Sequence, residues 1–503
     1  MPRTKKDLKQ AGAGSGKGDE AGKGDDAQQP PSETGQHEDE DVDKRSPSRI
    51  GARPDKPEDI KGKYRPAMHV VVLGPAGGPR EDRVTSLLVR SLATNWVPNS
   101  MVAVDAGTLL SGIIDALAVC KSENSVVTDG AFTGLPLPHQ TVEANSVHIF
   151  KDIIGSVLIT HPHLDHVSGL AINAPLLANG TVSKPVAALD SVIEALQKHI
   201  FNNVIWPNFS DEKGGIGCLT YKHLADGPSS MGSGDEKGYQ HACEGLLTQC
   251  FGLSHGKYPK PQGSNESVES GGETGTRRSS HPRASEQEYT TVESSAFFLY
   301  DQHTGAEIIV FGDTEPDTVS GQPRNLRVWQ AAAPRVASGQ LRAIFIECSH
   351  ANETQDVNLH GHLCPRHLAD ELCALAGLVA KERRQQLSST TKRKRERSSG
   401  SSAVEPDPKT RAKGKSPSAR GESPRSSSKT RTNEGAASTA PAFIGSPKGP
   451  LAGLSVYIIH VKEKFDDGPH PRETILKELN ELEKELELGC SFYAPVRGEE
   501  IYI

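Results

Sequence analysis

The sequence predicts an α/β domain in which buried strands alternate with helices. Short apolar runs recur along the chain, and the run at 68–74 (MHVVVLG) opens the series with a buried strand and a glycine turn. Between such runs the apolar residues take helical spacing, as Leu110, Ile113 and Leu117 do in the segment 108–120. This alternation is typical of a layered α/β domain.

The expected elements follow from these patterns in chain order. The strands share short apolar runs and lie at 68–74, 101–104, 156–159, 296–300, 307–311, 341–346 and 454–459. The helices share helical spacing and lie at 108–120, 189–200 and 365–378. Pro365 begins the last of these, at a position where proline is tolerated. The stripe of Ile475, Leu479, Leu482 and Leu486 predicts a further helix that packs on the core.

Composition predicts that part of the chain is disordered. Only 35% of the 503 residues are hydrophobic, and 49 glycines and 34 prolines are spread through them. We expect a disordered tail at 1–66 and one domain at 67–503. Low-complexity insertions at about 226–240, 259–288 and 381–449 interrupt that domain. Apolar strands lie on both sides of the insertions, so these are loop elaborations and not domain boundaries.

Charge and cysteine content limit the classes of protein. The formal charge of −7 is mild for this length and predicts neither a nucleic-acid binder nor a strongly acidic protein. The eight cysteines are scattered, as expected for free thiols in a reducing compartment. The N-terminus lacks an apolar signal region, and no uncharged apolar run is long enough to span a bilayer. We expect a cytoplasmic protein without membrane contact, while the basic cluster Lys392–Arg395 leaves nuclear import open.

The loop 161–166 (HPHLDH) is the strongest functional signal. Its imidazoles and carboxylate are ligands for zinc and similar first-row metals. In an extended loop His161 and His163 can point the same way, while Asp165 and His166 reach a second position. The loop therefore predicts two divalent metal ions, which can clamp a phosphate during in-line displacement. The alternative is a histidine-rich surface loop, which the density of ligands disfavours.

Three further residues are candidate ligands because each follows an apolar run. These are His255, Asp313 and His460. Rigid strands followed by loop residues can aim several side chains at one point. Each has an ordinary alternative: an exposed loop histidine for His255, a turn or helix-cap aspartate for Asp313, and a core or loop histidine for His460. Their recurrence after strands supports the metal site more than any one of them alone.

Glu347 and His362 form a different kind of pair. Glu347 ends a buried strand, and His362 lies with His360 in a loop just before a helix. A carboxylate that orients and charges an imidazole would make it a general acid for a leaving oxygen. A purely structural hydrogen-bonded pair is the equal alternative.

Six motifs together resemble one known family. They occur in family order at 70–79 (VVVLGPAGGP), 161–175 (HPHLDHVSGLAINAP), 201–208 (FNNVIWPN), 311–317 (FGDTEPD), 345–349 (FIECS) and 361–363 (GHL). The chain thereby resembles the class II 3',5'-cyclic nucleotide phosphodiesterases, the low-affinity cAMP phosphodiesterases of fungi. Asn173 stands where the family pattern has serine. The resemblance covers about residues 68–503 apart from the insertions.

The resemblance implies a metallo-β-lactamase fold, an αββα sandwich of two β-sheets with helices on both outer faces. The implied metal ligands are His161, His163 and His255 for one ion, Asp165, His166 and His460 for the other, and Asp313 for both. The implied catalytic residues are Asp165 and the charge-relay pair Glu347 and His362. The implied nucleotide-site residues are Asn202, Trp206 and Asn208. Trp206 is a candidate for base stacking, and a helix end packed on the core is the alternative for this segment.

The expected reaction is hydrolysis of the 3' ester of cAMP, with cGMP as a second candidate substrate, by a two-metal bridging-hydroxide mechanism that lowers cAMP signalling. Two divalent ions are the expected cofactors, with zinc first among them. Metal identity, nucleotide preference and oligomeric state are left open, and a homodimer is one option.

Two rival functions remain. A transfer-RNA 3'-processing nuclease of the same fold would need a basic, structured arm, whereas the basic stretch 381–431 looks disordered. A non-catalytic scaffold would have lost metal ligands, and none is lost.

Overall fold

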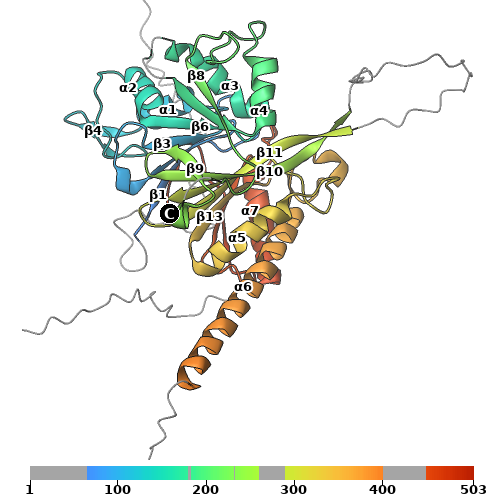
Figure 1. Ribbon diagram of the computed structural model, residues 1–503. Coiled ribbons are helices and arrows are strands. Elements are labelled where there is room, and N and C mark those ends of the chain that lie inside the picture. The colour runs from blue at the N-terminus through green and yellow to red at the C-terminus, as the bar shows by residue number, and fades with distance from the viewer. Residues whose placement is uncertain (1–64, 179, 181–182, 231–232, 260–288, 400–448) are drawn as a thin grey trace, which may run out of the picture. The chain divides into compact units, whose positions relative to one another are not determined.

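Two seven-stranded β-sheets form the centre of the molecule (Figure 1), in a computed structural model that describes residues 65–178, 180, 183–230, 233–259, 289–399 and 449–503. The described residues lie within a unit that spans Gly51–Ile503. The expected tail at 1–66 and the expected insertion at 259–288 lie almost entirely outside the described residues.

The first sheet has an antiparallel half and a parallel half. Its strands, in spatial order, are β16 (Glu500–Tyr502), β1 (Met68–Gly74), β2 (Ser86–Ser91), β3 (Met101–Val104), β6 (Ile154–Leu158), β7 (Lys184–Ala188) and β8 (Leu219–His223). Pairing is antiparallel from β16 to β3 and parallel from β3 to β8. The last strand of the chain thus pairs with the first and covers one edge of the sheet.

The second sheet is built in the same way. Its strands, in spatial order, are β15 (Ser491–Tyr493), β14 (Ser455–Ile459), β13 (Leu341–Glu347), β12 (Glu307–Phe311), β11 (Tyr289–Asp301), β10 (Leu246–Pro259) and β9 (Gln240–Cys243). The strands β12 to β15 are parallel. The carboxyl ends of β12, β13 and β14 therefore meet at one edge of the sheet. A small hairpin, β4 (Lys121–Glu123) with β5 (Val126–Asp129), stands apart from both sheets.

The two faces of the second sheet contact different cores. In β12, Ile308 and Val310 join the core shared with the first sheet, while Ile309 and Phe311 join the core beneath the helices. Successive side chains of a strand point to opposite faces, so one fully apolar strand can serve both cores. The αββα sandwich expected from the sequence is confirmed.

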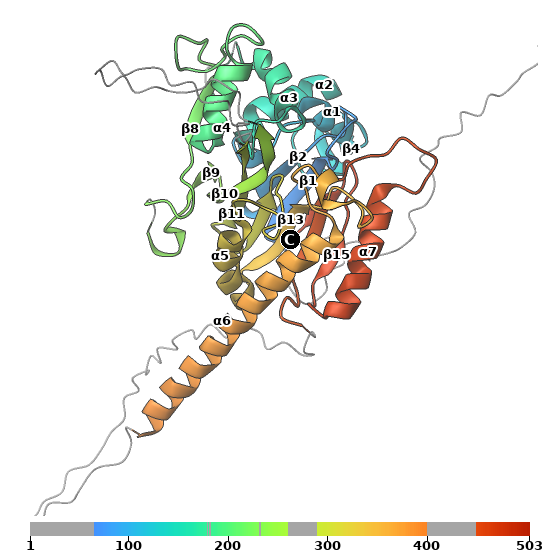
Figure 2. The same ribbon diagram turned by 90° about the vertical axis from the view of Figure 1, so that its right-hand side faces the viewer.

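Helices cover the outer faces of both sheets (Figures 1 and 2). Beside the first sheet lie α1 (Leu110–Ala118), α2 (Val142–His148), α3 (Leu164–Asn173) and α4 (Asp190–Ala195). On the second sheet lie α5 (Asn325–Ser338), α6 (Pro365–Ser399) and α7 (Pro471–Leu486). Short 3₁₀ or π turns occupy Leu92–Thr94, Ile149–Ile153, Ala174–Leu177, Leu196–Ile200, Gly234–Glu236 and Asp356–Asn358. Among the described residues, no helix is both long enough and apolar enough to cross a membrane.

Three elements differ from the expectation. The helix expected at 365–378 continues as α6 to Ser399, so the first part of the expected insertion 381–449 is helical. The strand expected at 296–300 is the end of the much longer β11, which pairs with β10 along its whole length. The segment 226–240, expected as a surface insertion, contains Tyr239, a buried residue whose hydroxyl donates to Glu307. Polar composition conceals the first two, because exposed helix and strand surfaces are polar too.

Candidate metal centre

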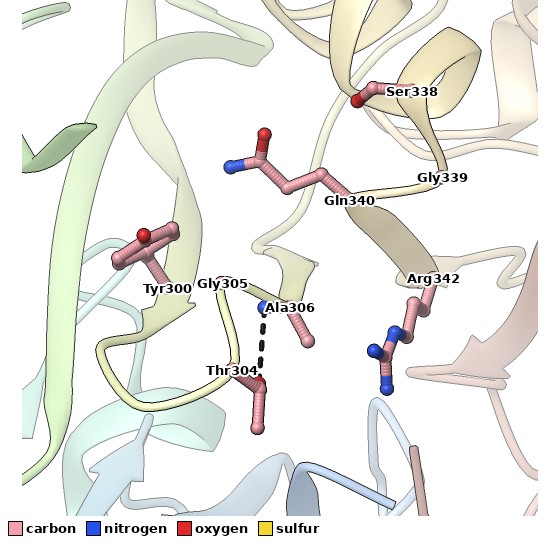
Figure 3. Close-up of a pocket in the computed structure, with 8 residues that line it drawn as sticks. All are labelled: Tyr300, Thr304, Gly305, Ala306, Ser338, Gly339, Gln340 and Arg342. Carbon is pink, nitrogen blue, oxygen red and sulfur yellow. Dashed lines mark hydrogen bonds between the residues drawn. The ribbon is translucent and has the colours of Figure 1, made fainter. Parts of the chain in front are cut away.

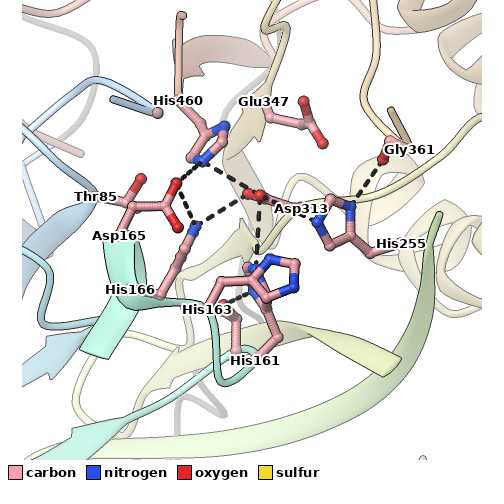
Figure 4. Close-up of polar contacts among 12 residues, drawn as sticks. Thr85, His161, His163, Asp165, His166, His255, Asp313, Glu347, Gly361 and His460 are labelled. Carbon is pink, nitrogen blue, oxygen red and sulfur yellow. Dashed lines mark hydrogen bonds and ion pairs between the residues drawn. The ribbon is translucent and has the colours of Figure 1, made fainter. Parts of the chain in front are cut away.

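Four expected metal ligands lie close together at or near strand ends (Figure 4). His161 follows β6, Asp313 follows β12, and His460 follows β14. His255 lies inside β10 at a point where the pairing with β11 shifts register. The first sheet supplies one of these residues and the second sheet supplies the other three.

The loop after His161 leads directly into α3. His163 is the N-cap of that helix, and Asp165 and His166 lie in its first turn. The N-terminus of a helix favours negative charge, which suits Asp165. Because side chains in this turn are fixed by the helix, the short loop delivers its ligands with little conformational freedom.

One set of donors comprises His161, His163, His255 and Asp313. Nε2 of His161 and Nε2 of His255 each lie 3.6 Å from Oδ2 of Asp313. Nε2 of His161 lies 3.0 Å from Nδ1 of His163. Ligand atoms of the four residues all lie within 4.8 Å of one another. Of these four residues only His163 is exposed, so the set faces solvent on the side of His163.

A second set of donors comprises Asp165, His166 and His460. Nε2 of His460 lies 3.3 Å from Oδ2 of Asp165, and Nε2 of His166 lies 4.0 Å from the same oxygen. Asp313 contacts this set as well: Oδ1 lies 3.3 Å from Nε2 of His166, and Oδ2 lies 3.2 Å from Nε2 of His460. The carboxylate of Asp313 therefore lies between the two sets.

The pKa values of His161 and Asp313 suit a divalent metal ion, whereas at His166 the charges of Asp313 and Asp105 outweigh burial and raise the pKa well above its usual value. Burial, together with the charge of His166, lowers the pKa of His161 well below its usual value, which keeps this imidazole neutral. Burial raises the pKa of Asp313, but the neighbouring imidazoles of His460 and His166 outweigh it and lower that pKa, which keeps the carboxylate ionised. Nε2 of His166 is buried and has no hydrogen-bond partner among the described residues. A buried nitrogen that lies among carboxylate oxygens without a hydrogen bond of good geometry fits a metal site.

Each of three ligand rings is oriented by a neighbour outside the cluster. Nδ1 of His255 donates to the carbonyl oxygen of Gly361 at 2.9 Å. Nδ1 of His460 lies 3.1 Å from the hydroxyl of Ser349. Occupying Nδ1 in this way leaves Nε2 as the atom that faces the cluster, so the neighbours fix which nitrogen can bind a metal.

Asp105 orients the third ring, and sequence reasoning did not assign it a role. It is buried with a positive φ of 56° directly after β3. Its carboxylate lies 2.8 Å from Nδ1 of His166 and accepts hydrogen bonds from the backbone and hydroxyl of Thr160. The signal was available, because Asp105 follows a strand as Asp313 does.

Glu347 and His362 form the expected pair beside the cluster. Both carboxylate oxygens of Glu347 lie 3.1 Å from Nδ1 of His362, and that nitrogen lies 3.7 Å from Oδ2 of Asp313. Burial lowers the pKa of His362, but the charge of Glu347 outweighs it, so that pKa is raised above the usual value. Glu347 is further held by the hydroxyl of Ser349 at 2.6 Å and the backbone of Thr314 at 2.7 Å. The pair therefore places an imidazole with a raised pKa at the edge of the cluster.

Comparison with known families agrees with this geometry. Residues 73–392 and 442–498 match the family described as cAMP phosphodiesterases class-II. The chain belongs to this family. It is therefore a phosphodiesterase, and its buried cluster of histidines and aspartates could hold divalent metal ions.

Individual relatives agree with the assignment to this family, and a solved structure agrees with the fold. A 3',5'-cyclic-nucleotide phosphodiesterase of Schizosaccharomyces pombe is 30% identical over 311 residues, which are 61% of this chain and 75% of that protein. A 3',5'-cyclic-nucleotide phosphodiesterase of Candida albicans is 24% identical and matches 87% of this chain and 100% of that protein. The crystal structure of unliganded yeast PDE1 superposes with a TM-score of 0.58 at 20% identity, covering 87% of this chain and 100% of that one. This last likeness shows the shared fold.

The segment 201–208, expected to line the nucleotide site, is a tightly hydrogen-bonded loop. The side chain of Asn202 accepts from the backbone of Val204 and donates to the carbonyl of Lys198. The side chain of Asn208 donates to the carbonyl of Glu212. Among the described residues, no hydrogen bond of either asparagine reaches the phosphodiesterase metal centre. Their polar atoms serve the loop, and their role in substrate binding stays a prediction.

A separate surface pocket lies beside the amino ends of strands β12 and β13 (Figure 3). Its volume is about 480 Å³, and its lining includes Thr304, Ala306 and Gln340. Ala306 and Gln340 immediately precede β12 and β13, whereas the metal centre lies beyond the carboxyl ends of these strands. The pocket is therefore distinct from the phosphodiesterase site.

Proposed function

We propose that this phosphodiesterase hydrolyses the 3' ester of 3',5'-cyclic AMP to 5'-AMP at a centre of two divalent ions. The observation that supports two ions is the position of Asp313, whose carboxylate contacts both sets of donors. A single ion needs about four protein ligands, and seven donors exceed that number. Zinc is the proposed metal because imidazole and carboxylate suit it, and manganese is the alternative to be tested.

The proposed ligand assignment follows the two sets of donors. His161, His163 and His255 hold one ion, Asp165, His166 and His460 hold the other, and Asp313 bridges both. When bound, two such ions activate water as a nucleophile and neutralise charge on the phosphate. Asp105, Ser349 and Gly361 keep the three imidazoles they contact turned toward the ions.

Glu347 and His362 are proposed to assist departure of the leaving group. Glu347 holds Nδ1 of His362 and keeps the ring protonated. The protonated ring can then donate to the 3' oxygen of the ribose as its bond to phosphorus breaks. Without that proton the leaving alkoxide would be poorly stabilised, so the pair supports the rate of bond cleavage and not the binding of substrate.

The test is direct. Purified protein loaded with zinc or manganese is incubated with cAMP, and the products are separated by chromatography. We expect 5'-AMP and no 3'-AMP, with activity lost in His163→Ala. Absence of 5'-AMP above that variant would contradict the proposal. Parallel assays with cGMP measure preference, since two Dictyostelium discoideum relatives of 23% and 25% identity are named cAMP/cGMP phosphodiesterases.

One structural observation gives the RNA-processing alternative some support. That alternative needs a basic, structured arm, and α6 carries the basic cluster Lys392–Arg395 within a helix that reaches Ser399. Figure 2 shows α6 extending away from the rest of the domain. Comparing turnover of cAMP with that of a precursor transfer RNA decides between the two substrates. We expect turnover of cAMP alone, and cleavage of the RNA would favour the alternative.

A further inference from the structure

Lys462 is a cation at the metal centre that the proposed reaction has not yet used. It lies two residues after His460, where the chain leaves β14. Its Nζ lies 3.6 Å from Oδ2 of Asp165 and donates to the carbonyl oxygen of Gly77 at 2.5 Å. The side chain is 30% exposed, so one side of it faces solvent. The ammonium group is therefore held by two neighbours, while part of the side chain stays exposed.

The charge balance of the centre makes a lysine at this position informative. Among the seven proposed ligands only Asp165 and Asp313 carry negative charge, and two divalent ions bring four positive charges. Counting the ions and their direct ligands alone, the positive charges exceed the negative ones by 4 − 2 = 2, while the carboxylates of Asp105 and Glu347 lie just outside this set. The ammonium of Lys462 is attracted by Asp165 but would be repelled by bound divalent ions, and an anion bound between them would offset that repulsion. A phosphate diester is such an anion.

The hydrogen-bonding capacity of Lys462 leads to the same conclusion. An ammonium group has three N–H donors. In the described part of the chain, Gly77 accepts from one donor and Asp165 lies within reach of a second. The third is available to a ligand that enters from the solvent side.

We propose that Lys462 binds a non-bridging phosphate oxygen of the cyclic nucleotide and of its monophosphate product. This inference rests on the proposed function for its substrate, but the binding of phosphate itself can be measured without turnover. The chemical class of ligand is a phosphate mono- or diester. The competing explanation is that Lys462 merely holds Asp165 and the loop at Gly77 in position.

The experiment titrates inorganic phosphate, and then 5'-AMP, into the zinc-loaded full-length protein by calorimetry at fixed ionic strength. Lys462→Gln retains a donor for Gly77 but removes the charge. We expect its Kd for phosphate to rise roughly 10- to 100-fold, because a hydrogen bond to a charged group is lost. Lys462→Arg should restore part of the affinity. Zinc content, measured by elemental analysis, should stay at the wild-type level in both variants.

Lys464→Gln is the matched control. Lys464 lies two residues further along, is 55% exposed and pairs with the exposed Glu353 at 3.4 Å. We expect its phosphate affinity to match wild type. The inference is overturned if Lys462→Gln binds phosphate within about twofold of wild type, a change too small for a charged hydrogen bond. It is also overturned if affinity falls only in step with lost zinc, because Lys462 would then be a positioning residue.

The kinetic readout separates this inference from the proposed function. If wild-type protein binds phosphate but yields no 5'-AMP from cAMP, the proposed function fails. The titration then still tests whether Lys462 binds phosphate. If wild-type protein turns over cAMP and Lys462→Gln shows unchanged KM, kcat and phosphate affinity, only the inference about Lys462 fails. Thermal unfolding of Lys462→Gln and Lys462→Arg confirms that both variants are folded.

Discussion

The His460 ring is held by two neighbours that are not metal ligands themselves. Ser349 contacts its Nδ1, and Gly77 lies against the part of the ring that holds Cε1 and the two nitrogens. A methyl group added to Gly77 would overlap the imidazole, because the ring occupies the space where a Cβ would lie. The glycine in the loop after β1 is therefore required by close packing against a ligand. The sequence motif at 70–79 indicated a family likeness but not this reason for it.

Gly77→Ala should weaken metal binding without unfolding the protein. The added methyl group must push His460 from its position, and displaced ligands typically cost roughly 10- to 100-fold in metal affinity. The measurement is competitive titration of zinc against a chromophoric chelator. Gly377→Ala is the control, because an added Cβ at this exposed position of α6 meets nothing within 4 Å among the described residues. Equal zinc affinity in Gly77→Ala and wild type would contradict the packing argument.

His362 should govern the alkaline limb of the pH profile. Its pKa is raised by Glu347 against the effect of burial, so the ring stays protonated to a higher pH than an ordinary histidine. A general acid acts only while protonated, so kcat should fall as the pH rises through that pKa. Glu347→Gln removes the charge that raises the pKa, so the fall in kcat should move to lower pH. His362→Asn should lose roughly 10²- to 10⁴-fold in kcat.

His360→Asn is the matched control for the proton donor. His360 is exposed, has a positive φ of 51°, and asparagine tolerates that backbone conformation. We expect its pH profile and zinc content to equal those of wild type. If Glu347→Gln lowers kcat but leaves the alkaline limb in place, the pair is structural and the acid role is wrong.

At the scale of elements, buried strands were the most predictable part of the chain. The strands β1, β3 and β12 lie where their apolar runs place them, because burial on both faces requires uninterrupted apolar sequence. Ligands that follow such strands could be found by the same signal. Asp105 was missed although it follows β3, because its partners, Thr160 and His166, are distant in sequence and meet it only in the folded sheet.

Elements with an exposed surface were less predictable. The distal part of α6 has no apolar stripe, since residues such as Leu387 contact solvent and lysine and arginine dominate. Those residues are good helix formers, so helical propensity and low-complexity composition make opposite predictions there. Sequence alone could not decide between them. The role of the loop 201–208 stays a prediction for a related reason, because its asparagines are equally suited to a turn and to a ligand.

The pairing of β1 with β16 contains a histidine that should make stability depend on pH. His69 of β1 stacks on Tyr502 of β16 at 4.7 Å between ring centroids. Neither of its ring nitrogens has a hydrogen-bond partner among the described residues. Burial, with a smaller effect of Arg90, lowers its pKa to about 3. Below pH 6.5 His69 therefore binds a proton in the unfolded chain but stays neutral in the folded chain. The stability that is present above pH 6.5 is lost as the pH falls toward 3.

His69→Phe isolates this effect. Phenylalanine can keep the stacking on Tyr502 but cannot take up a proton in the unfolded chain. Between pH 7.5 and pH 5 the free energy of unfolding of wild type should fall by about 2 kcal/mol more than that of the variant. The measurement is urea unfolding at several pH values in that range. Parallel pH dependence in the two proteins would show that His69 is not buried in its neutral form.

At the scale of the whole molecule, the metal centre joins the two sheets. His161, His163, Asp165 and His166 follow strand β6 of the first sheet. His255, Asp313 and His460 come from β10, β12 and β14 of the second. Ions bound to both sets would cross-link the two halves of the sandwich. Removal of the ions would leave the buried carboxylates without these counterions. On the proposed assignment, catalysis and stability would depend on the same residues.

Removal of metal should consequently lower the stability of the folded domain. A ligand that binds only the folded state adds about 2.7 kcal/mol when it is present at 100 times its Kd. Chelation followed by dialysis should lower the unfolding midpoint in differential scanning calorimetry, and added zinc should restore it. His255→Ala should show a smaller shift on chelation, because one donor of the first set is missing. If elemental analysis shows complete removal of metal and the midpoint does not move, the two sheets are held by their apolar core alone, and the centre serves catalysis without contributing to the fold.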